Sequence, residues 1–138
     1  MLISTPRILI TDDDRDFRET LRGVFEPRGF ETLVAADGEQ ALEIVRLNRI
    51  HLLLTDMHMP RMTGLEAIRR IKEFSRVIPC ILISAGLDET LVEEARKAEA
   101  FSVLPKPVRF REVTLAVSDA LQVVYGWPEG EGASVDEQ

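Results

Sequence analysis

The sequence has little of what several protein classes require. Its 138 residues include one cysteine, one tryptophan, one tyrosine and two histidines. A single cysteine has no partner for an internal disulfide. Cys80 lies in an apolar segment, so we expect a small buried hydrophobe in a reducing compartment rather than a reactive thiol. The two histidines, His51 and His58, give no support to a zinc site, and His51 is expected to lie at the surface.

Basic residues are also scarce. Lys and Arg number 17 against 24 Asp and Glu, which gives a net charge of −7. Surfaces that bind nucleic acids need clustered basic residues, so we expect no nucleic-acid partner. No apolar run approaches the roughly 20 residues of a membrane span, and residues 1–6 lack the charged and apolar regions of a secretion signal. We therefore expect a cytoplasmic protein that does not bind membranes.

The apolar residues, 45% of the chain, come in five short runs that alternate with amphipathic stretches. The length suits one domain with its own core. Because the runs are continuous, they indicate strands that are buried on both faces of a parallel sheet. Five repeats of strand and helix predict a doubly wound α/β fold. The runs occupy residues 8–10, 30–35, 52–55, 80–83 and 101–104.

The amphipathic stretches carry apolar residues at helical spacing. Asp37 and Gln40 have the spacing of a capping box before the second helix, and Asp88 can cap the fourth. The apolar positions of the helices include Phe17, Leu21, Val24, Phe25, Ala41, Leu42, Ile44, Val45, Leu65, Ile68, Ile71, Leu91, Ala95, Ala98, Val113, Ala116, Val117, Ala120, Leu121 and Val124.

After Tyr125 the composition changes to glycine, proline and acidic residues. We therefore expect one domain over residues 1–125, followed by an acidic, Gly-rich and disordered tail over residues 126–138. Trp127 is expected to belong to this frayed end rather than to dock on the domain.

Polar residues follow four of the five apolar runs. Asp12 and Asp13 come after the first run, Asp56 after the third, Ser84 after the fourth and Lys106 after the fifth. Ligands of open α/β sheets bind at the carboxyl ends of the strands. We therefore expect three acids, a hydroxyl and an ammonium group to meet at one edge of the sheet.

These residue types suit phosphoryl transfer. Clustered carboxylates repel one another unless a cation neutralises them, and Mg²⁺ prefers oxygen ligands. Beside such an ion Asp56 stays ionised and can attack phosphorus as a nucleophile. Lys106 and the Ser84 hydroxyl can then neutralise further phosphoryl oxygens.

The sequence resembles the receiver domain of bacterial two-component response regulators. The resemblance covers about residues 6–124 and implies a flavodoxin-like (βα)5 sheet with strand order 2-1-3-4-5. It rests on Ile8 to Asp14, on Leu53 to Pro60 with Gly64, on Ile83-Ser84-Ala85 and on Lys106-Pro107.

The resemblance implies that Asp56 accepts a phosphoryl group from the phosphohistidine of a sensor histidine kinase or a histidine phosphotransfer protein. The cofactor would be Mg²⁺, or Mn²⁺ in its place. Asp13 and Asp56 would ligate the metal directly, Asp12 through water, and His58 through its backbone carbonyl.

The remaining motif residues would form a switch. Ser84 would move toward the phosphoryl group, the small Ala85 would leave access, and Lys106 would pair with phosphoryl oxygens. The Lys106-Pro107 bond would be cis. The family usually has an aromatic residue at the position of Val103, and its ring relays the signal by changing rotamer. Valine has no ring that could relay the signal in this way.

Three further residues lie close to the motifs in the sequence. Phe101 is aromatic and lies two positions before Val103, and we expect it in the core. The side chain of His58 either influences the lifetime of the phosphoryl group or is an exposed loop residue. Asp14 is expected to be an acid at a helix N-terminus, favoured there by the helix dipole, rather than a third metal ligand.

Two other functions, a phosphohydrolase and a flavin-binding module, fit the sequence less well than a receiver. A phosphohydrolase with an aspartyl-phosphate intermediate generally needs an acid two residues after the nucleophile, where this chain has His58. A flavin module would need a phosphate loop where the chain has acids. The receiver would catalyse only its own phosphorylation and dephosphorylation, and it is either a stand-alone regulator or a piece of a larger regulator or hybrid kinase. Its downstream protein partner is unknown, and the family allows a phosphorylation-dependent homodimer through the fourth helix, fifth strand and fifth helix.

Overall fold

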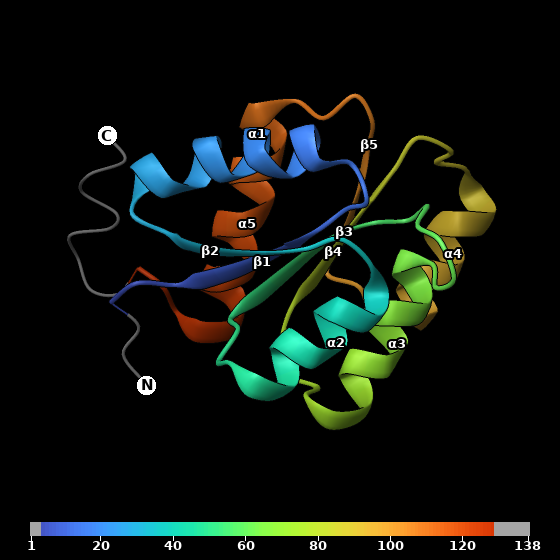
Figure 1. Ribbon diagram of the computed structural model, residues 1–138, viewed down its shortest axis with the longest axis horizontal. Helices are drawn as coiled ribbons and strands as arrows, with labels where there is room; N and C mark the ends of the chain where they lie inside the picture. Colours follow the sequence, from blue (N-terminus) through green and yellow to red (C-terminus); the bar gives the residue numbers. More distant parts are fainter. Residues whose placement is uncertain (1–3, 129–138) are drawn as a thin grey trace.

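The computed structural model describes residues 4–128, which form a five-stranded parallel sheet with helices on both faces (Figure 1). The sheet order is β2-β1-β3-β4-β5, so the predicted fold is confirmed. Within this part of the chain no helix combines the length and apolar character that a bilayer crossing requires. In chain order the elements are β1 (Arg7–Thr11), α1 (Arg15–Phe25), the short 3-10 helix η1 (Glu26–Arg28), β2 (Glu31–Ala35), α2 (Gly38–Leu47), β3 (Leu52–Asp56), α3 (Gly64–Phe74), β4 (Cys80–Ser84), α4 (Glu89–Lys97), β5 (Ser102–Pro105) and α5 (Phe110–Tyr125).

The sheet divides the core into two parts because successive strand residues point to opposite faces. In β1, Leu9 packs on the side of α2, α3 and α4, whereas Ile8 and Ile10 pack on the side of α1 and α5 (Figure 1). The central strands β3 and β4 are buried at every position. The apolar runs of β3 and β4 are therefore buried on both faces, as predicted, whereas the edge strands β2 and β5 are only partly buried.

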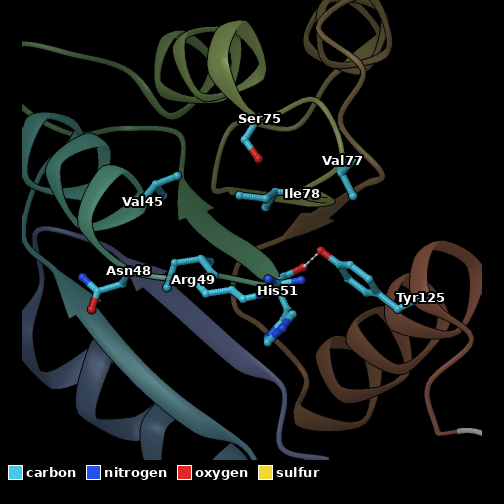
Figure 2. A pocket seen from close by; sticks show the side chains of 9 residues that line it. Val45, Asn48, Arg49, His51, Ser75, Val77, Ile78 and Tyr125 are labelled. Carbon is cyan, nitrogen blue, oxygen red and sulfur yellow. Dashed lines mark hydrogen bonds between the residues drawn. The ribbon is translucent and has the colours of Figure 1, made fainter. Parts of the chain in front are cut away.

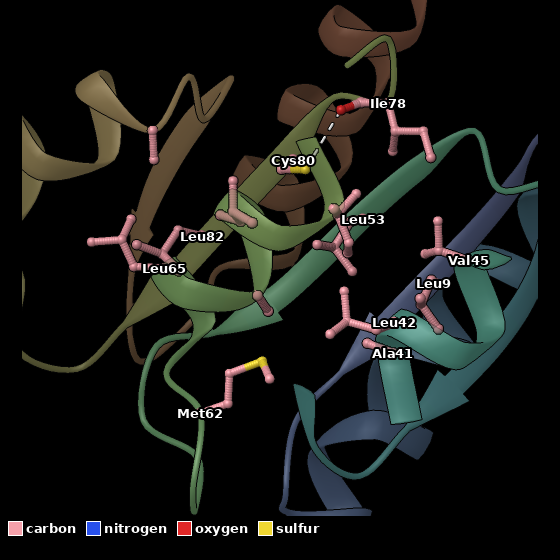
Figure 3. Packing of buried hydrophobic residues seen from close by; sticks show 14 of the residues in the cluster. Leu9, Ala41, Leu42, Val45, Leu53, Met62, Leu65, Ile78, Cys80 and Leu82 are labelled. Atoms are coloured by element: carbon pink, nitrogen blue, oxygen red, sulfur yellow. Dashed lines mark hydrogen bonds between the residues drawn. The ribbon is translucent and has the colours of Figure 1, made fainter. Parts of the chain in front are cut away.

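The core beneath α2 and α3 accounts for the lone cysteine and for one of the methionines (Figure 3). The Cys80 thiol is buried and donates to the Ile78 carbonyl at 3.5 Å. Burial raises the pKa of the Cys80 thiol to about 12, so the sulfur stays protonated and unreactive at neutral pH. Met62 packs against Gly38, where an added Cβ would lie 2.6 Å from the methionine sulfur. Both sulfur atoms therefore serve packing.

Helix caps agree only in part with the sequence pattern. Asp37 accepts from the Gln40 N–H at 2.8 Å, as expected, but the Gln40 side chain accepts from Ala36 instead of closing the box on Asp37. The complete capping box begins α3: Thr63 accepts from the Glu66 N–H at 3.1 Å, and Glu66 accepts from the Thr63 N–H at 2.9 Å. The Thr-x-x-Glu spacing was available in the sequence as a signal for this helix start.

The prediction that Phe101 lies in the core is wrong. Strand β5 begins one residue later, at Ser102, and the Phe101 side chain is 37% exposed. Its backbone N–H still donates to the Cys80 carbonyl at 2.7 Å. The chain is therefore joined to β4 before the strand begins, while the bend at Phe101 turns the ring outward.

The expectation for Trp127 is also corrected. Its ring packs on Phe30 with 5.2 Å between the ring centroids, and its N–H donates to the Leu121 carbonyl at 3.2 Å. The partial burial of the indole against the core beside α5 stabilises the docked position of the chain past the end of the helix. The rest of the predicted disordered tail, residues 129–138, lies outside the described residues, and the domain boundary after Tyr125 stays a prediction.

His51 is buried, so its predicted surface role is wrong. Its side-chain Nδ1 accepts from the Arg7 N–H at 2.9 Å, and its backbone carbonyl accepts from the Tyr125 hydroxyl at 2.8 Å. The two rings meet edge to face at 5.6 Å. These contacts join β1, β3 and α5 at the amino-terminal edge of the sheet, beside a cavity of about 340 Å³ (Figure 2). The cavity is lined by Val45, Asn48, Arg49, Ile50, His51, Ser75, Val77, Ile78 and Tyr125.

We expect the stability of the protein to fall as the pH drops below about 6.5, the ordinary pKa of histidine. Burial, together with the charges of Arg49 and Arg7, lowers the pKa of His51 in the folded protein. The unfolded chain therefore binds a proton that the folded chain excludes. At pH 5.5 this costs up to about 1.4 kcal/mol in the free energy of unfolding.

Urea unfolding of wild type and His51→Asn at pH 7.5 and 5.5 checks this prediction. An asparagine oxygen can still accept from the Arg7 N–H, but it does not titrate in this range. We expect the wild type to lose more stability between the two pH values than the variant loses. Equal losses would show that His51 is not the group responsible.

Candidate functional site

Four strands deliver the predicted site residues to one edge of the sheet. Asp12 directly follows β1, Asp56 is the last residue of β3, Ser84 is the last residue of β4, and Lys106 directly follows β5. The parallel register explains the meeting: Asp56 is paired with Ile83, the residue before Ser84, and Ser84 is paired with Pro105, the residue before Lys106. Strand ends that are far apart in the sequence therefore lie side by side.

The Lys106 ammonium group joins two of the acids. Its Nζ lies 3.1 Å from Asp12 Oδ2 and 3.2 Å from Asp56 Oδ1. Both carboxylates are nearly inaccessible, whereas the lysine side chain is 25% exposed. Burial opposes the charge on Lys106, but the hydrogen bonds and charges of the two aspartates outweigh it and raise the pKa of the lysine. Lys106 is therefore a permanent cation at neutral pH.

The three carboxylates form a group that could hold a metal ion. One ligand oxygen from each of Asp12, Asp13 and Asp56 lies within 4.8 Å of the others. Three negative charges against the one positive charge of Lys106 leave two in excess. Burial and the charge of Asp56 raise the pKa of Asp12, even though the Asp14 N–H and Lys106 act in the opposite direction. An all-oxygen donor set with an excess of two negative charges fits Mg²⁺ or Mn²⁺.

Local hydrogen bonds fix Asp12 in this group. Its Oδ1 accepts from the Asp14 N–H at 2.8 Å, and its backbone carbonyl accepts from Arg18 Nη1 at 2.7 Å. Asp14 in turn caps α1, because its carboxylate accepts from the N–H groups of Asp16 and Phe17. Asp14 therefore lies at the N-terminus of α1, as predicted, and its side chain also caps that helix. The acidic run after β1 serves both the site and the helix that follows.

Ser84 is fully buried at the end of β4, and its hydroxyl oxygen accepts from the Gly86 N–H at 3.0 Å. This bond uses the oxygen only, so the hydroxyl proton is still available for donation. Ala85, the next residue, is exposed. The role of Ala85 in leaving access to the carboxylates, which the resemblance implied, stays a prediction.

Gly64 is packed directly beneath Asp56. An added Cβ would overlap the Asp56 carbonyl oxygen and would lie 2.9 Å from both the Asp56 carbonyl carbon and the Leu82 side chain. The Gly64 N–H donates to the Met57 carbonyl at 2.9 Å, which closes the loop between β3 and α3. Glycine is needed here because of close backbone approach, since its φ is not positive.

The other predicted residues lie around this centre. His58 is exposed, with its Nε2 near Gly86, and the ligand role of its carbonyl stays a prediction. The Lys106-Pro107 peptide bond is cis, as the resemblance implied. Val103 is partly buried against the core beneath α4, in register with Leu82, and provides no ring.

One contact of the centre was not predicted. The helical spacing of Phe17 indicated only the apolar side of α1, but its ring lies under the Lys106 ammonium, with Nζ 4.4 Å from the ring centroid. An aromatic residue four positions after Asp13 was the available signal, but nothing in the sequence placed Lys106 above it.

Comparison with known proteins identifies this arrangement. The sequence model of the response regulator receiver domain matches residues 8–118. The chain belongs to the response regulator receiver family. Proteins similar to it include sporulation initiation phosphotransferase F of Bacillus subtilis, which is 36% identical over 115 residues that cover 83% of this chain and 93% of that protein. A response regulator receiver protein of Anaeromyxobacter is 38% identical over 102 residues, which are 74% of this chain and 43% of that protein.

Some relatives are much longer than this receiver. The regulatory protein AtoC of Escherichia coli is 34% identical over 85% of this chain, but the match spans only 25% of AtoC. Among solved structures, a receiver domain from Clostridium thermocellum has a TM-score of 0.80 at 28% identity, covering 86% of this chain and 95% of that one. A receiver domain of an HD domain-containing protein from Pseudomonas fluorescens has a TM-score of 0.84 at 26% identity, covering 88% and 98%.

Proposed function

We propose that this receiver accepts a phosphoryl group on Asp56 from a phosphohistidine of a sensor kinase or histidine phosphotransfer protein, in a reaction that depends on Mg²⁺. The observation that carries the proposal is the Asp56 carboxylate, 3.2 Å from the Lys106 ammonium and within 4.8 Å of the ligand oxygens of Asp12 and Asp13. Family membership supports it, and the relative named a phosphotransferase agrees with the chemistry.

In the proposed reaction an Asp56 carboxylate oxygen forms a bond to phosphorus as the bond between phosphorus and the imidazole nitrogen breaks. The electron pair of the broken bond stays on that nitrogen, and the product is an acyl phosphate. Lys106 neutralises one phosphoryl oxygen, and the Ser84 hydroxyl donates a hydrogen bond to another. Asp12, Asp13, Asp56 and the His58 carbonyl would hold the metal ion, which would supply positive charge against a third phosphoryl oxygen.

The direct test uses a small phosphodonor in place of the kinase. With acetyl phosphate and Mg²⁺, we expect the intact mass of the full chain to rise by one phosphoryl group. Asp56→Asn should prevent the gain, because an amide is not a nucleophile toward phosphorus. A chelator of divalent cations should prevent it in the wild type. An unchanged wild-type mass, or a gain that survives in the asparagine variant, would refute the proposal.

The protein acts by changing its surface. It catalyses only its own phosphorylation and dephosphorylation, and the phosphohydrolase alternative has no support, since His58 occupies the position of the second acid. The phosphoryl group adds about −1.5 to −2 charge at Asp56 and shifts the balance between two forms of the domain. The responding face would be formed by α4, β5 and α5 and would bind a protein partner or a second copy of the chain. Because Val103 has no ring, the signal would reach this face without the movement of an aromatic side chain.

A further inference from the structure

The Lys106 ammonium group is held from two sides by different kinds of interaction. Asp12 and Asp56 hold it by charge, at 3.1 and 3.2 Å. The Phe17 ring holds it by the electron-rich face of the aromatic system, with Nζ 4.4 Å from the ring centroid. A cation within about 6 Å of a ring centroid is attracted to it, and more strongly when water is kept away.

The ring is itself firmly placed. Phe17 lies in the first turn of α1, where its N–H is held by the Asp14 cap at 3.4 Å. Its side chain is partly buried and packs on the core between the sheet and α1. The cap that follows the metal-binding acids therefore also fixes the position of the ring. Phe17 reaches Lys106 without belonging to any motif of the family that the sequence displays.

The two kinds of contact respond differently when the site is loaded. A divalent cation on the carboxylates competes with Lys106 for their negative charge and weakens their hold on the ammonium. The attraction of an uncharged ring for the ammonium does not depend on that charge. A lysine side chain that nothing holds moves among many rotamers, so an additional restraint on Lys106 matters most in the metal-loaded site.

We propose that Phe17 is a positioning residue, whose ring keeps the Lys106 ammonium over the phosphoacceptor carboxylate when a metal ion has taken over the charge of the aspartates. This inference rests on the proposed function of Asp56 but concerns a different residue and a different interaction. It predicts that Phe17 affects the rate of phosphorylation and not the binding of the metal.

The test compares Phe17→Leu, which stays apolar but has no π face, with Phe17→Tyr, which retains one. With acetyl phosphate and saturating Mg²⁺, we expect the leucine variant to be phosphorylated about two- to fivefold more slowly than wild type, the range that a cation–π contact implies. The tyrosine variant should match the wild type. Leu21→Val, one turn further along α1 in the same core, is the packing control and should also match.

A second readout observes the contact itself. In wild-type NMR spectra, the methylene protons next to Lys106 Nζ should be shifted upfield by the ring, both without and with Mg²⁺. The shift should be lost in Phe17→Leu and kept in Phe17→Tyr, while the midpoint of the Mg²⁺ titration stays the same in all three proteins.

The outcomes separate the two proposals. If wild type takes up no phosphoryl group, the function proposed for Asp56 fails. If wild type is phosphorylated but Phe17→Leu reacts at the same rate, or Phe17→Tyr is as slow as leucine, the role of Phe17 is overturned while that of Asp56 stands. Loss of the upfield shift on adding Mg²⁺ would overturn it as well.

Discussion

Replacing Gly64 with alanine should lower the free energy of unfolding by about 3 kcal/mol or more, because the new methyl group has no space. It would overlap the Asp56 carbonyl oxygen and press on the Leu82 side chain. A side chain can change its rotamer, but the carbonyl belongs to β3, a strand buried at every position. The backbone of β3 or the start of α3 would have to move, and the phosphoacceptor would move with it.

Gly23→Ala is the matched control. Gly23 lies within α1, and a Cβ there would meet nothing within 4 Å. Alanine favours the helix, so this variant should gain about 0.5–1 kcal/mol. Urea unfolding at neutral pH measures both changes. If Gly64→Ala were as stable as wild type, the close approach of α3 to β3 would have to be wrong, and with it the way the loop supports Asp56.

Removing the ammonium group with Lys106→Met should slow phosphorylation by acetyl phosphate by about 100-fold, the usual effect of losing one fixed charge that stabilises a transition state. The variant should also unfold more easily without divalent metal. Asp12 is 1% exposed and would lose its only cationic partner among the ion pairs of the described residues. A buried pair broken on one side costs about 3–5 kcal/mol, and partial exposure of the lysine reduces the expected loss to about 2 kcal/mol.

The pH dependence of the Lys106→Met variant provides a second check. Burial raises the pKa of Asp12 and Lys106 lowers it, so removing the lysine raises it further. An acid with a raised pKa in the folded state destabilises the protein as the pH rises and it ionises. The stability loss of the variant should therefore be larger at pH 7 than at pH 4.

Lys97→Met is the control for the change in net charge. Lys97 lies at the exposed end of α4, and its loss should leave both stability and phosphorylation near wild-type values. If Lys106→Met were phosphorylated as fast as this control, the proposed part of Lys106 in neutralising the phosphoryl group would be wrong.

Much of this protein follows from the sequence alone. Continuous apolar runs are typical of a parallel sheet covered by helices on both faces, and five repeats of such a run with an amphipathic stretch predicted the fold class. Parallel strands place their carboxyl ends at one edge, so the positions of Asp12, Asp56, Ser84 and Lys106 after their runs were enough to predict that they meet. The position of Asp14 before an amphipathic stretch was also enough to place it at the N-terminus of a helix.

Only the tertiary structure decided which side chains contact one another across separate elements. Phe17 has the same helical spacing whether it faces a core or a lysine, and the 88 residues between Phe17 and Lys106 hide the contact from any local pattern. His51 is polar and precedes a strand, which predicted a surface position, but α5 packs beside it and the Tyr125 hydroxyl donates a hydrogen bond to its carbonyl. Phe101 reads as the start of a strand, but a bend turns its ring outward. Periodicity reports which face of an element is apolar, whereas the partner of a side chain depends on how separate elements pack together.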